Sequence, residues 1–294
     1  MNQVQHQSLS WRIAPDRELS LDQPRLMGIL NLTPDSFSDG GKYATGAAAA
    51  DAALRMRDEG ACMIDVGGES TRPGAAPVDA AEQIRRTIPV IQAIRKRAAS
   101  SELLISIDTT SEKVAQAALD AGANVINDIS AGRDDPRMFA LASSWHCGII
   151  LMHRRTSPGQ DNYSDQYVAA PDYAGDVVGA VRRFLDGRCR QAVGAGIDPR
   201  GIVVDPGLGF GKNVEQNYEL ARRVGELMAM GYPILSAASR KSFIGAASGE
   251  CDPSRRINGT LAISVAHYLA GVRLFRVHDV AAHRQALAVA RALG

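Results

Sequence analysis

Short apolar runs alternate with longer amphipathic stretches along most of the chain, from about Leu26 to the C-terminus. The runs are too short for helices, and most of their residues are β-branched or otherwise apolar, as in parallel strands buried on both faces. We therefore expect eight buried strands: Leu26–Leu30, Cys62–Val66, Leu103–Ile107, Asn124–Ile126, Gly148–Met152, Ile202–Val204, Pro233–Ser236 and Val272–Val277.

The stretches between the runs repeat apolar residues at helical spacing. Glycine stands just before several strands, at Gly60, Gly122, Gly231 and Gly271, where a preceding helix commonly ends. The predicted helices include Gly46–Glu59, Pro77–Ala98, Ser111–Ala121, Asp172–Val193, Val214–Met230 and a closing helix, Asp279–Leu293.

Eight strands alternating with helices predict an α/β protein made of a single (β/α)₈ TIM barrel. A doubly wound sheet is the alternative, but it rarely accommodates eight parallel strands in a chain of 294 residues without a leftover domain. We assign residues 25–294 to the barrel. Residues 1–24 form an N-terminal extension, which we expect to be a hairpin or plug at the barrel bottom.

Composition narrows the class of protein. The chain is 45% hydrophobic and 22% charged, with a net charge of +1, which gives no support to nucleic-acid or membrane-surface binding. The four cysteines lie far apart without metal-site spacing. The N-terminus has no apolar signal segment, and no run is long enough to span a membrane. We expect a cytoplasmic protein with reduced thiols.

Polar side chains stand where the predicted strands end. They are Asn31, Asp65, Asp108, Asn127 with Asp128, His153, Asp205, Ser239 through Lys241, and Arg276 with His278. The strand starts show no comparable set, and barrel enzymes build their active sites at the carboxyl ends of their strands. This asymmetry predicts an enzyme.

The residue types also indicate the kind of substrate. Asp108, Asn127 and Asp205 suit the edge of a flat heterocycle with adjacent N–H and C=O groups. The cationic candidates Arg72, Lys241, Arg276 and His278 suit a phosphate group, and the oxygen of Asn31 suits Mg²⁺. The glycines of Asp205–Asn213 allow close approach of a ligand, but their spacing is not that of a dinucleotide-binding turn.

Two segments at these positions, MGILNLTPDSFSDGG (Met27–Gly41) and IDVGGESTRPGA (Ile64–Ala75), resemble the signature segments of dihydropteroate synthases. The family's remaining blocks are matched in order by Ile105–Thr109, Asn124–Ser130, Leu151–His153, Asp205–Asn213, Ser239–Gly245 and Phe275–Val280. The resemblance covers about Leu26 to Leu293.

This resemblance implies a transferase of folate biosynthesis. Its reaction condenses 6-hydroxymethyl-7,8-dihydropterin diphosphate with p-aminobenzoate to give 7,8-dihydropteroate and pyrophosphate, by a dissociative displacement. It also implies a homodimer. The implied catalytic residues are Asp108, Asp205 and Lys241, which grip the pterin together with Asn127.

The remaining implied roles are substrate and metal contacts. Met152 and Phe210 line the pterin slot with Ile29 and Ile129. Arg276 and His278 hold the diphosphate, and Asn31 holds it through Mg²⁺. The p-aminobenzoate side consists of Thr71, Arg72, Pro73, Phe210 and Ser242.

Two departures from the family pattern stand out. The usual Met-x-Gly-x-Pro after LMH is replaced by Arg154–Pro158, followed by the unfamiliar Asp161–Tyr167, and Ala237 and Ala238 stand where glycine is usual. These departures leave open a catalytically weak pterin-binding paralogue. A pterin-dependent methyltransferase is a further alternative, although that class lacks the TRPG and SRKS blocks present here.

Two hypotheses concern assembly and order of binding. The helix after the seventh strand carries apolar residues around an arc of roughly 200°, which favours a dimer interface shared with the closing helix. The polar loops 33–43 and 67–77 have few apolar anchors, and we expect them to order only after the diphosphate binds.

Overall fold

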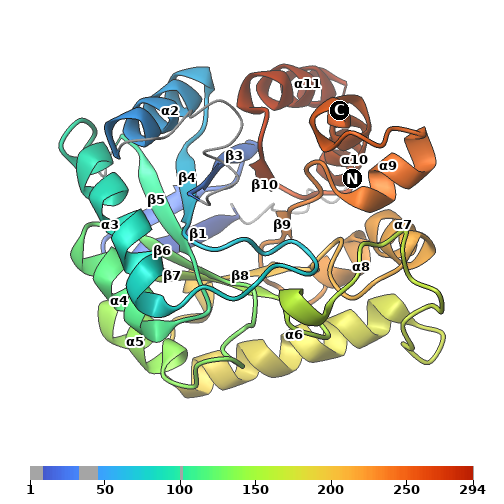
Figure 1. Ribbon diagram of the computed structural model, residues 1–294, viewed down its shortest axis with the longest axis horizontal. Coiled ribbons are helices and arrows are strands. Elements are labelled where there is room, and N and C mark those ends of the chain that lie inside the picture. Colours follow the sequence, from blue (N-terminus) through green and yellow to red (C-terminus); the bar gives the residue numbers. More distant parts are fainter. Residues whose placement is uncertain (1–8, 33–45, 100–101, 294) are drawn as a thin grey trace, which may run out of the picture.

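The computed structural model describes residues 9–32, 46–99 and 102–293. Its centre is a barrel of eight parallel strands surrounded by helices (Figure 1), which confirms the predicted (β/α)₈ fold. The strands are neighbours in the order β8-β7-β6-β5-β4-β3-β10-β9. Their bounds are β3 Arg25–Asn31, β4 Met63–Gly67, β5 Leu104–Asp108, β6 Val125–Asp128, β7 Gly148–Met152, β8 Ile202–Asp205, β9 Leu235–Ser236 and β10 Leu274–Val277.

The barrel closes between β8 and β9 through a narrow seam. Strand β9 has two residues, and its side of the seam is joined to β8 by one parallel bridge, Val204 with Ile234. The amide of Val204 also donates to Pro233 O at 2.9 Å. By contrast, β3 and β4 pair over five residues. The β8–β9 seam is thus a weak point of the barrel wall.

The helices follow the predicted order, but several of their ends differ. Their bounds are α2 Gly46–Glu59, α3 Ala80–Arg95, α4 Glu112–Asp120, α5 Met138–Trp145, α6 Val177–Gly194, α7 Val214–Arg222, α8 Gly225–Met228, α9 Ser242–Ser248, α10 Ile257–Leu269 and α11 Val280–Ala292, with 3₁₀ turns η1 Pro158–Gln160, η2 Pro199–Gly201 and η3 Pro253–Arg255.

Capping explains the later starts. Helix α3 begins after Asp79, whose carboxylate accepts from Glu82 N at 2.8 Å, and α6 begins after Asp176, which accepts from Gly179 N. Such caps satisfy amides that have no partner within the helix. The predicted helix Val214–Met230 is two helices, which separate just before Gly225, a residue of low helix propensity.

Two layers of side chains hold the barrel together. The larger layer lies between strands and helices and includes Ile64, Ile105, Ile126 and Val204, all fully buried. A smaller cluster fills the barrel bottom with Met27, Met63, Leu104, Val125, Ile150, Val203, Leu235 and Leu274.

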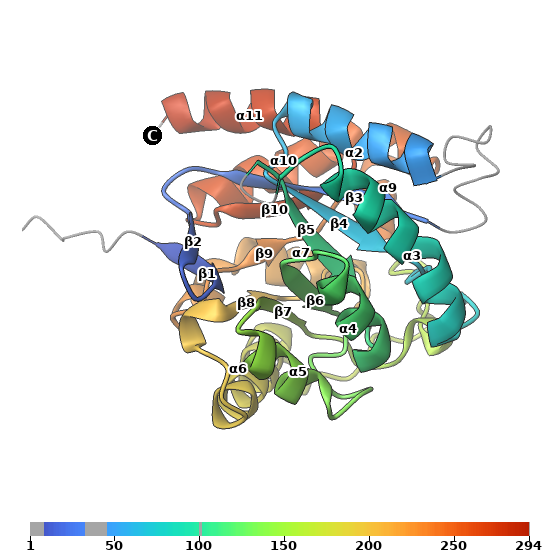
Figure 2. The same cartoon turned by 90° about the vertical axis from the view of Figure 1, so that its left-hand side faces the viewer.

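An N-terminal antiparallel hairpin completes the bottom cluster. Its strands are β1 Ser10–Ala14 and β2 Arg17–Ser20, and it lies at one end of the barrel, on the left in Figure 2. Trp11 is fully buried among the bottom-cluster side chains, and its indole N–H donates to Gly201 O at 2.9 Å. The predicted extension therefore contains a hairpin that plugs the barrel.

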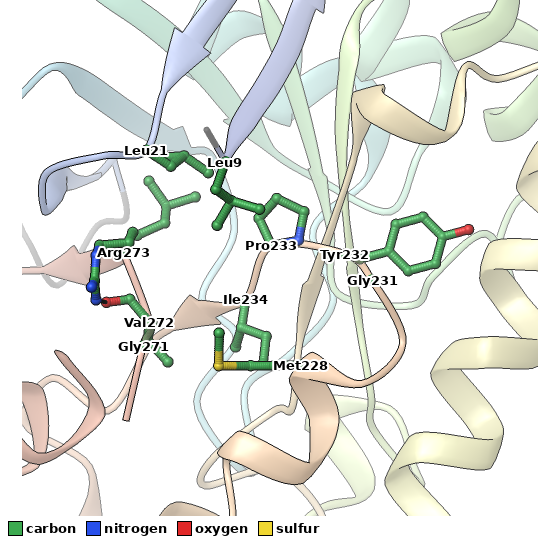
Figure 3. Close-up of a pocket in the computed structure, with 11 residues that line it drawn as sticks. Leu9, Leu21, Met228, Gly231, Tyr232, Pro233, Ile234, Gly271, Val272 and Arg273 are labelled. Atoms are coloured by element: carbon green, nitrogen blue, oxygen red, sulfur yellow. Dashed lines mark hydrogen bonds between the residues drawn. The ribbon is translucent and has the colours of Figure 1, made fainter. Parts of the chain in front are cut away.

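Two cavities also lie at this end. The smaller, of about 90 Å³, lies beside β9, between Leu9 and Leu21 on one side and Pro233 and Ile234 on the other (Figure 3). The larger, of about 480 Å³, lies under α5, between Arg12 and Cys147. Both are at the strand starts, away from the polar residues of the strand ends. Within the described residues, no helix combines the length and apolar character needed to cross a membrane.

Candidate active site

A buried network of an ion-paired arginine and its neighbours links β10 across the barrel mouth to β4, β5 and β6. The guanidinium of Arg276 on β10 donates to Asp65 Oδ2 at 2.6 Å and to Asp108 Oδ2 at 2.8 Å. The side-chain amide of Asn127 donates to the same oxygen of Asp65 at 3.0 Å. Parallel pairing places Asp108 beside Asn127 in register. Arg276 and Asn127 thus both contact one further residue, for which no substrate role was predicted, and Arg276 links it to Asp108.

That residue is Asp65. It has no substrate role in the sequence analysis, yet it is fully buried inside β4 and contacts two predicted substrate residues. Its sequence position could have indicated this role, because Asp65 is a carboxylate within an apolar strand. A buried carboxylate of this kind needs a cation as partner. Asp65 Oδ1 and Asp108 Oδ1 are both buried without a hydrogen-bond partner among the described residues. They are acceptors available to a ligand.

Burial makes the site carboxylates easy to protonate. It raises the pKa of Asp108 to about 7, with Asp65 adding to the rise and Arg276 opposing it. Burial likewise raises the pKa of Asp205 to about 6, against the effect of the Gly207 amide, which donates to Asp205 Oδ1 at 2.7 Å. Such perturbed groups in one cluster are typical of a catalytic site.

An apolar cluster lies next to these polar groups. It consists of Ile129, Met152 and Phe210, from the ends of β6 and β7 and the loop after β8. The ammonium of Lys241 lies 3.9 Å from the centre of the Phe210 ring. Burial lowers the pKa of Lys241 to about 8, and Arg276 lowers it further. The site therefore has a flat apolar wall with acceptors and a cation at its edge, which suits a polar heterocycle.

The loop after β8 can approach this wall because of its glycines. Gly207 has φ +69°, and a Cβ there would come within 1.9 Å of His153 O. Gly209 has φ +79° and packs against the Lys241 stem. Side chains at these positions would displace both neighbours.

Positive charge gathers around His278. Its imidazole Nδ1 is 2.9 Å from Ser239 Oγ. Burial, together with Arg240, Arg276, Lys241 and Arg72, holds the pKa of His278 well below its usual value. Arg240 is paired with Asp279 at 2.7 Å, whereas neither Lys241 nor Arg72 forms an ion pair within the described residues. The surplus of cations makes this side of the barrel mouth a site for an anion.

Asn31 ends β3 beside the carboxylate network. Its Oδ1 and Asp108 Oδ2 are the nearest polar side-chain atoms to Gly67, at 3.3 and 3.8 Å from where a Cβ would stand. Gly67 thus leaves room for the Asn31 side chain. No cluster of three or more His, Cys, Asp or Glu side chains suited to a metal occurs in the described residues, so a metal here would need oxygens from a ligand.

The residues predicted to contact p-aminobenzoate lie on two sides of the barrel mouth. Thr71, Arg72 and Pro73 follow β4, with Arg72 exposed. Ser242 begins α9, and its hydroxyl accepts from Ser164 N at 2.9 Å. The first predicted loop, residues 33–43, lies outside the described residues.

Comparisons with known proteins identify the family of this chain. A family model described as "Pterin binding enzyme" matches residues 27–278. The dihydropteroate synthase of Synechocystis sp. is 44% identical over 268 residues, covering 91% of this chain and 89% of that protein.

Solved structures of dihydropteroate synthases superpose on nearly the whole length of this chain. The dihydropteroate synthase of Xanthomonas albilineans with 4-aminobenzoic acid superposes with a TM-score of 0.87 at 41% identity, covering 97% of this chain and 98% of that one. The Thermus thermophilus enzyme in complex with 6HMPPP gives a TM-score of 0.79 at 40% identity, with 97% and 99% covered. The chain belongs to the pterin binding enzyme family and, within it, to the dihydropteroate synthases.

Proposed function

We propose that this barrel condenses 6-hydroxymethyl-7,8-dihydropterin diphosphate with p-aminobenzoate, using the residues at its strand ends. The observation behind this proposal is that Asp108 pairs in register with Asn127 and Asp205 pairs with Met152 of the apolar cluster. Asp108 Oδ1 is also buried without a hydrogen-bond partner among the described residues. A pterin edge carries the N–H donors that such acceptors require. Lys241, above Phe210, would lie beside the ring.

The reaction needs the diphosphate to leave. The C–O bond breaks with its electron pair going to the diphosphate, and the pterin methylene becomes cationic. Carboxylates at Asp205 and Asp108 favour that positive charge, while Arg276 and Lys241 stabilise the leaving group. The arylamine nitrogen then forms the new C–N bond and loses a proton.

His278 would respond to the same anion. Burial and four nearby cations lower the pKa of its imidazole, and a bound diphosphate would offset the cations and raise that pKa. A protonated His278 then donates to the leaving group, with Ser239 Oγ holding its orientation.

The donor set at β3 fits Mg²⁺. Asn31 Oδ1 beside the Asp108 carboxylate offers hard oxygen ligands, and Mg²⁺ normally takes few protein ligands and completes its shell with water and phosphate. When bound, the ion supplies positive charge to the departing diphosphate. Asn31 would hold the ion at the end of β3.

Turnover of purified protein with pterin diphosphate, p-aminobenzoate and Mg²⁺ tests the reaction. Formation of dihydropteroate with equimolar pyrophosphate supports it, and pterin binding without product would identify a paralogue that lacks turnover. Asn31→Ala should weaken binding of the pterin diphosphate and spare a pterin lacking the diphosphate. Equal losses for both ligands would make Asn31 a scaffold residue.

We also propose a homodimer formed through α10 and α11. Helix α10 buries its polar residues Thr260, Ser264 and His267 and turns Leu269 outward, 59% exposed. His267 contacts Ser236 Oγ at 2.8 Å, so the helix face toward the barrel carries polar residues beside the buried Tyr268. Helix α11 lies beside α10 (Figure 1). It exposes Val289, and Leu293 just after its end is exposed as well. A partner would cover this apolar face.

A cytoplasmic location fits the cysteines. Cys62, Cys147, Cys189 and Cys251 are all free thiols, as in proteins of a reducing compartment. Cell fractionation with an antibody to the protein would test this placement.

A further inference from the structure

We infer that Arg240 is a positioning residue: with Asp279 as its partner, it holds the turn after β9 in the conformation that places Lys241 in the site. Because Lys241 lies beside the pterin in the proposed reaction, this role rests on the proposed function. An arginine at the mouth of a barrel that binds a diphosphate would ordinarily be taken for a contact to the anion. The bonds of Arg240 assign it a conformational role instead.

The chain turns sharply after β9, over the four residues from Ala238 to Lys241. Lys241 N donates to Ala238 O at 3.2 Å, which closes the turn. Arg240, the third residue of the turn, has φ +61°. Turns with positive φ at this position normally take glycine, because a Cβ is crowded there. A bulky residue such as arginine adopts this region only rarely, so the turn needs support from outside it.

The side chain of Arg240 supplies part of that support. Its guanidinium donates to both carboxylate oxygens of Asp279, at 2.7 and 3.1 Å. The two side chains are 29% and 23% exposed, so water screens the pair only in part. Asp279 stands at the N-cap of α11, but within the described residues its side chain caps none of the helix amides. Its carboxylate is thus committed to Arg240, and a bidentate pair fixes direction as well as distance.

The backbone groups of Arg240 are held as well, both from the start of α10. Arg240 N donates to Thr260 Oγ at 3.1 Å, and the Thr260 hydroxyl donates to Arg256 O at 2.9 Å. The guanidinium of Arg256 donates to Arg240 O at 3.2 Å. The side chain, the amide and the carbonyl of this one residue are therefore each bonded to groups outside the turn.

Support from β10 and α10 matters because β8 gives this turn little. Strand β9 pairs with β10 over both of its residues, whereas one bridge, Val204 with Ile234, joins its side of the seam to β8 in the described residues. Beyond β9 the attachment to β10 continues through side chains. His278 N donates to Ser239 Oγ at 3.2 Å, and the ion pair of Arg240 follows. The turn is thus fixed to β10.

The position of Lys241 depends on this turn because Lys241 is its last residue. The Lys241 ammonium lies 3.9 Å from the centre of the Phe210 ring, which belongs to the loop across the seam. If residue 240 relaxed to negative φ, the chain would leave the turn in another direction and carry Lys241 away from that ring. Asp279 therefore acts on Lys241 through the conformation of Arg240.

Paired double variants test this role, because they separate the charge of Arg240 from its backbone conformation. Asp279→Ala should lower kcat/KM about tenfold, since a turn with positive φ loses its side-chain support. In that background Arg240→Gly should recover most of the loss, whereas Arg240→Ala should not. The two double variants carry the same charge and differ by one methyl group, which makes positive φ costly at residue 240.

Binding and control measurements accompany the kinetics. Calorimetry with the pterin diphosphate should rank the two double variants in the same order, because Lys241 contacts that substrate. Asp279→Asn, which keeps the side-chain shape, should show the same rescue and replaces Asp279→Ala if that variant does not fold. The matched control is His146→Gly, at an exposed residue with φ +49° at the end of α5, on the side of the strand starts. It should leave kcat/KM unchanged, alone or combined with Asp279→Ala.

Equal activity of the two double variants would overturn the inference, because the conformation of residue 240 would then not matter. So would tighter binding of the pterin diphosphate by Asp279→Ala that Arg240→Gly abolishes, since Arg240 would then contact the anion directly. An inactive wild-type enzyme would instead contradict the proposed reaction. Calorimetry on the same variants would still report on the turn, so the two failures are distinguishable.

Discussion

At the residue scale, the site carboxylates work against the stability of the fold. Asp205 is 3% exposed, and burial raises its pKa to about 6 from 3.8. Between those two pH values the folded chain holds a proton that the unfolded chain has lost. Stability therefore falls as pH rises through this window, and at neutral pH the ionised Asp205 is a destabilising group kept for its chemistry.

Asp205→Asn should separate these two effects. We expect kcat/KM to fall by up to about a hundredfold, because a charge-assisted acceptor for the pterin is lost. The melting temperature at pH 7.5 should rise, by about 2–4 °C for each kcal/mol gained in a chain of this size. The stability difference from wild type should shrink as pH drops from 6 to 4. Unchanged activity would remove Asp205 from the pterin contacts, and a lower melting temperature would refute the stability argument.

Asp65 offers a second residue-scale test. Its negative charge adds to the raised pKa of Asp108, after burial itself. Asp65→Asn should lower that pKa and shift the acidic limb of the kcat/KM profile to lower pH than in the wild type. Arg276 would keep Asp108 as its partner, so some activity should remain. A pH profile that coincides with wild type would show that Asp108 does not govern this limb.

The site residues differ in how far sequence could predict them. Asp108 and Asp205 end their strands and Asn127 is next to last in its own, so the pattern alone places them at the barrel mouth. Asp65 lies within its strand, and its contacts depend on a partner 211 positions away, Arg276. Such pairing is set by barrel closure and leaves no local trace in the sequence.

At the element scale, the N-terminal hairpin serves as the floor of the barrel. Trp11 is fully buried there, whereas the other tryptophan, Trp145, is 39% exposed on α5. Trp11→Ala should destabilise the protein by about 3–5 kcal/mol, because it leaves a large cavity and removes the contact with Gly201. Trp145→Ala should cost far less. Chemical denaturation of both variants measures the difference, and equal losses would mean that the hairpin is only loosely attached.

Element boundaries show where the sequence reading loses accuracy. Hydrophobic runs located all eight strands, because strands buried on both faces need apolar residues at most positions. The starts of α3 and α6 were placed too early, since Asp79 and Asp176 act as caps within polar stretches that also suit a helix. The break between α7 and α8 was missed, because one glycine in a long amphipathic pattern is a weak signal.

At the scale of the whole molecule, the outward apolar face of α10 predicts association. Leu269→Lys should convert a dimer to a monomer at micromolar concentration, because a charge would be buried without a partner at the interface. Val193→Lys, on a 38% exposed position of α6, is the control and should leave the mass unchanged. Light scattering reports the mass directly. A wild-type monomer would withdraw the dimer proposal.

The whole fold followed from counting strands, but the contacts of the segment 158–173, between β7 and α6, did not. Its contacts are to backbone groups at Gly74 and Gly211, which any residue type could provide. Neither composition nor periodicity distinguishes a loop tied at several points from a free one.

The narrow seam between β8 and β9 also divides the pterin site. Asp205 ends β8, while Lys241 follows β9, and the only backbone pairing between these strands is at Val204 and its neighbours in the described residues. A pterin that contacts both side chains would link β8 to the loop after β9 across this seam. Bound ligand should then slow amide hydrogen exchange at Val204 and Leu235 much more than at β4. The bound substrate would thereby help to close the barrel between β8 and β9, where few backbone hydrogen bonds do so.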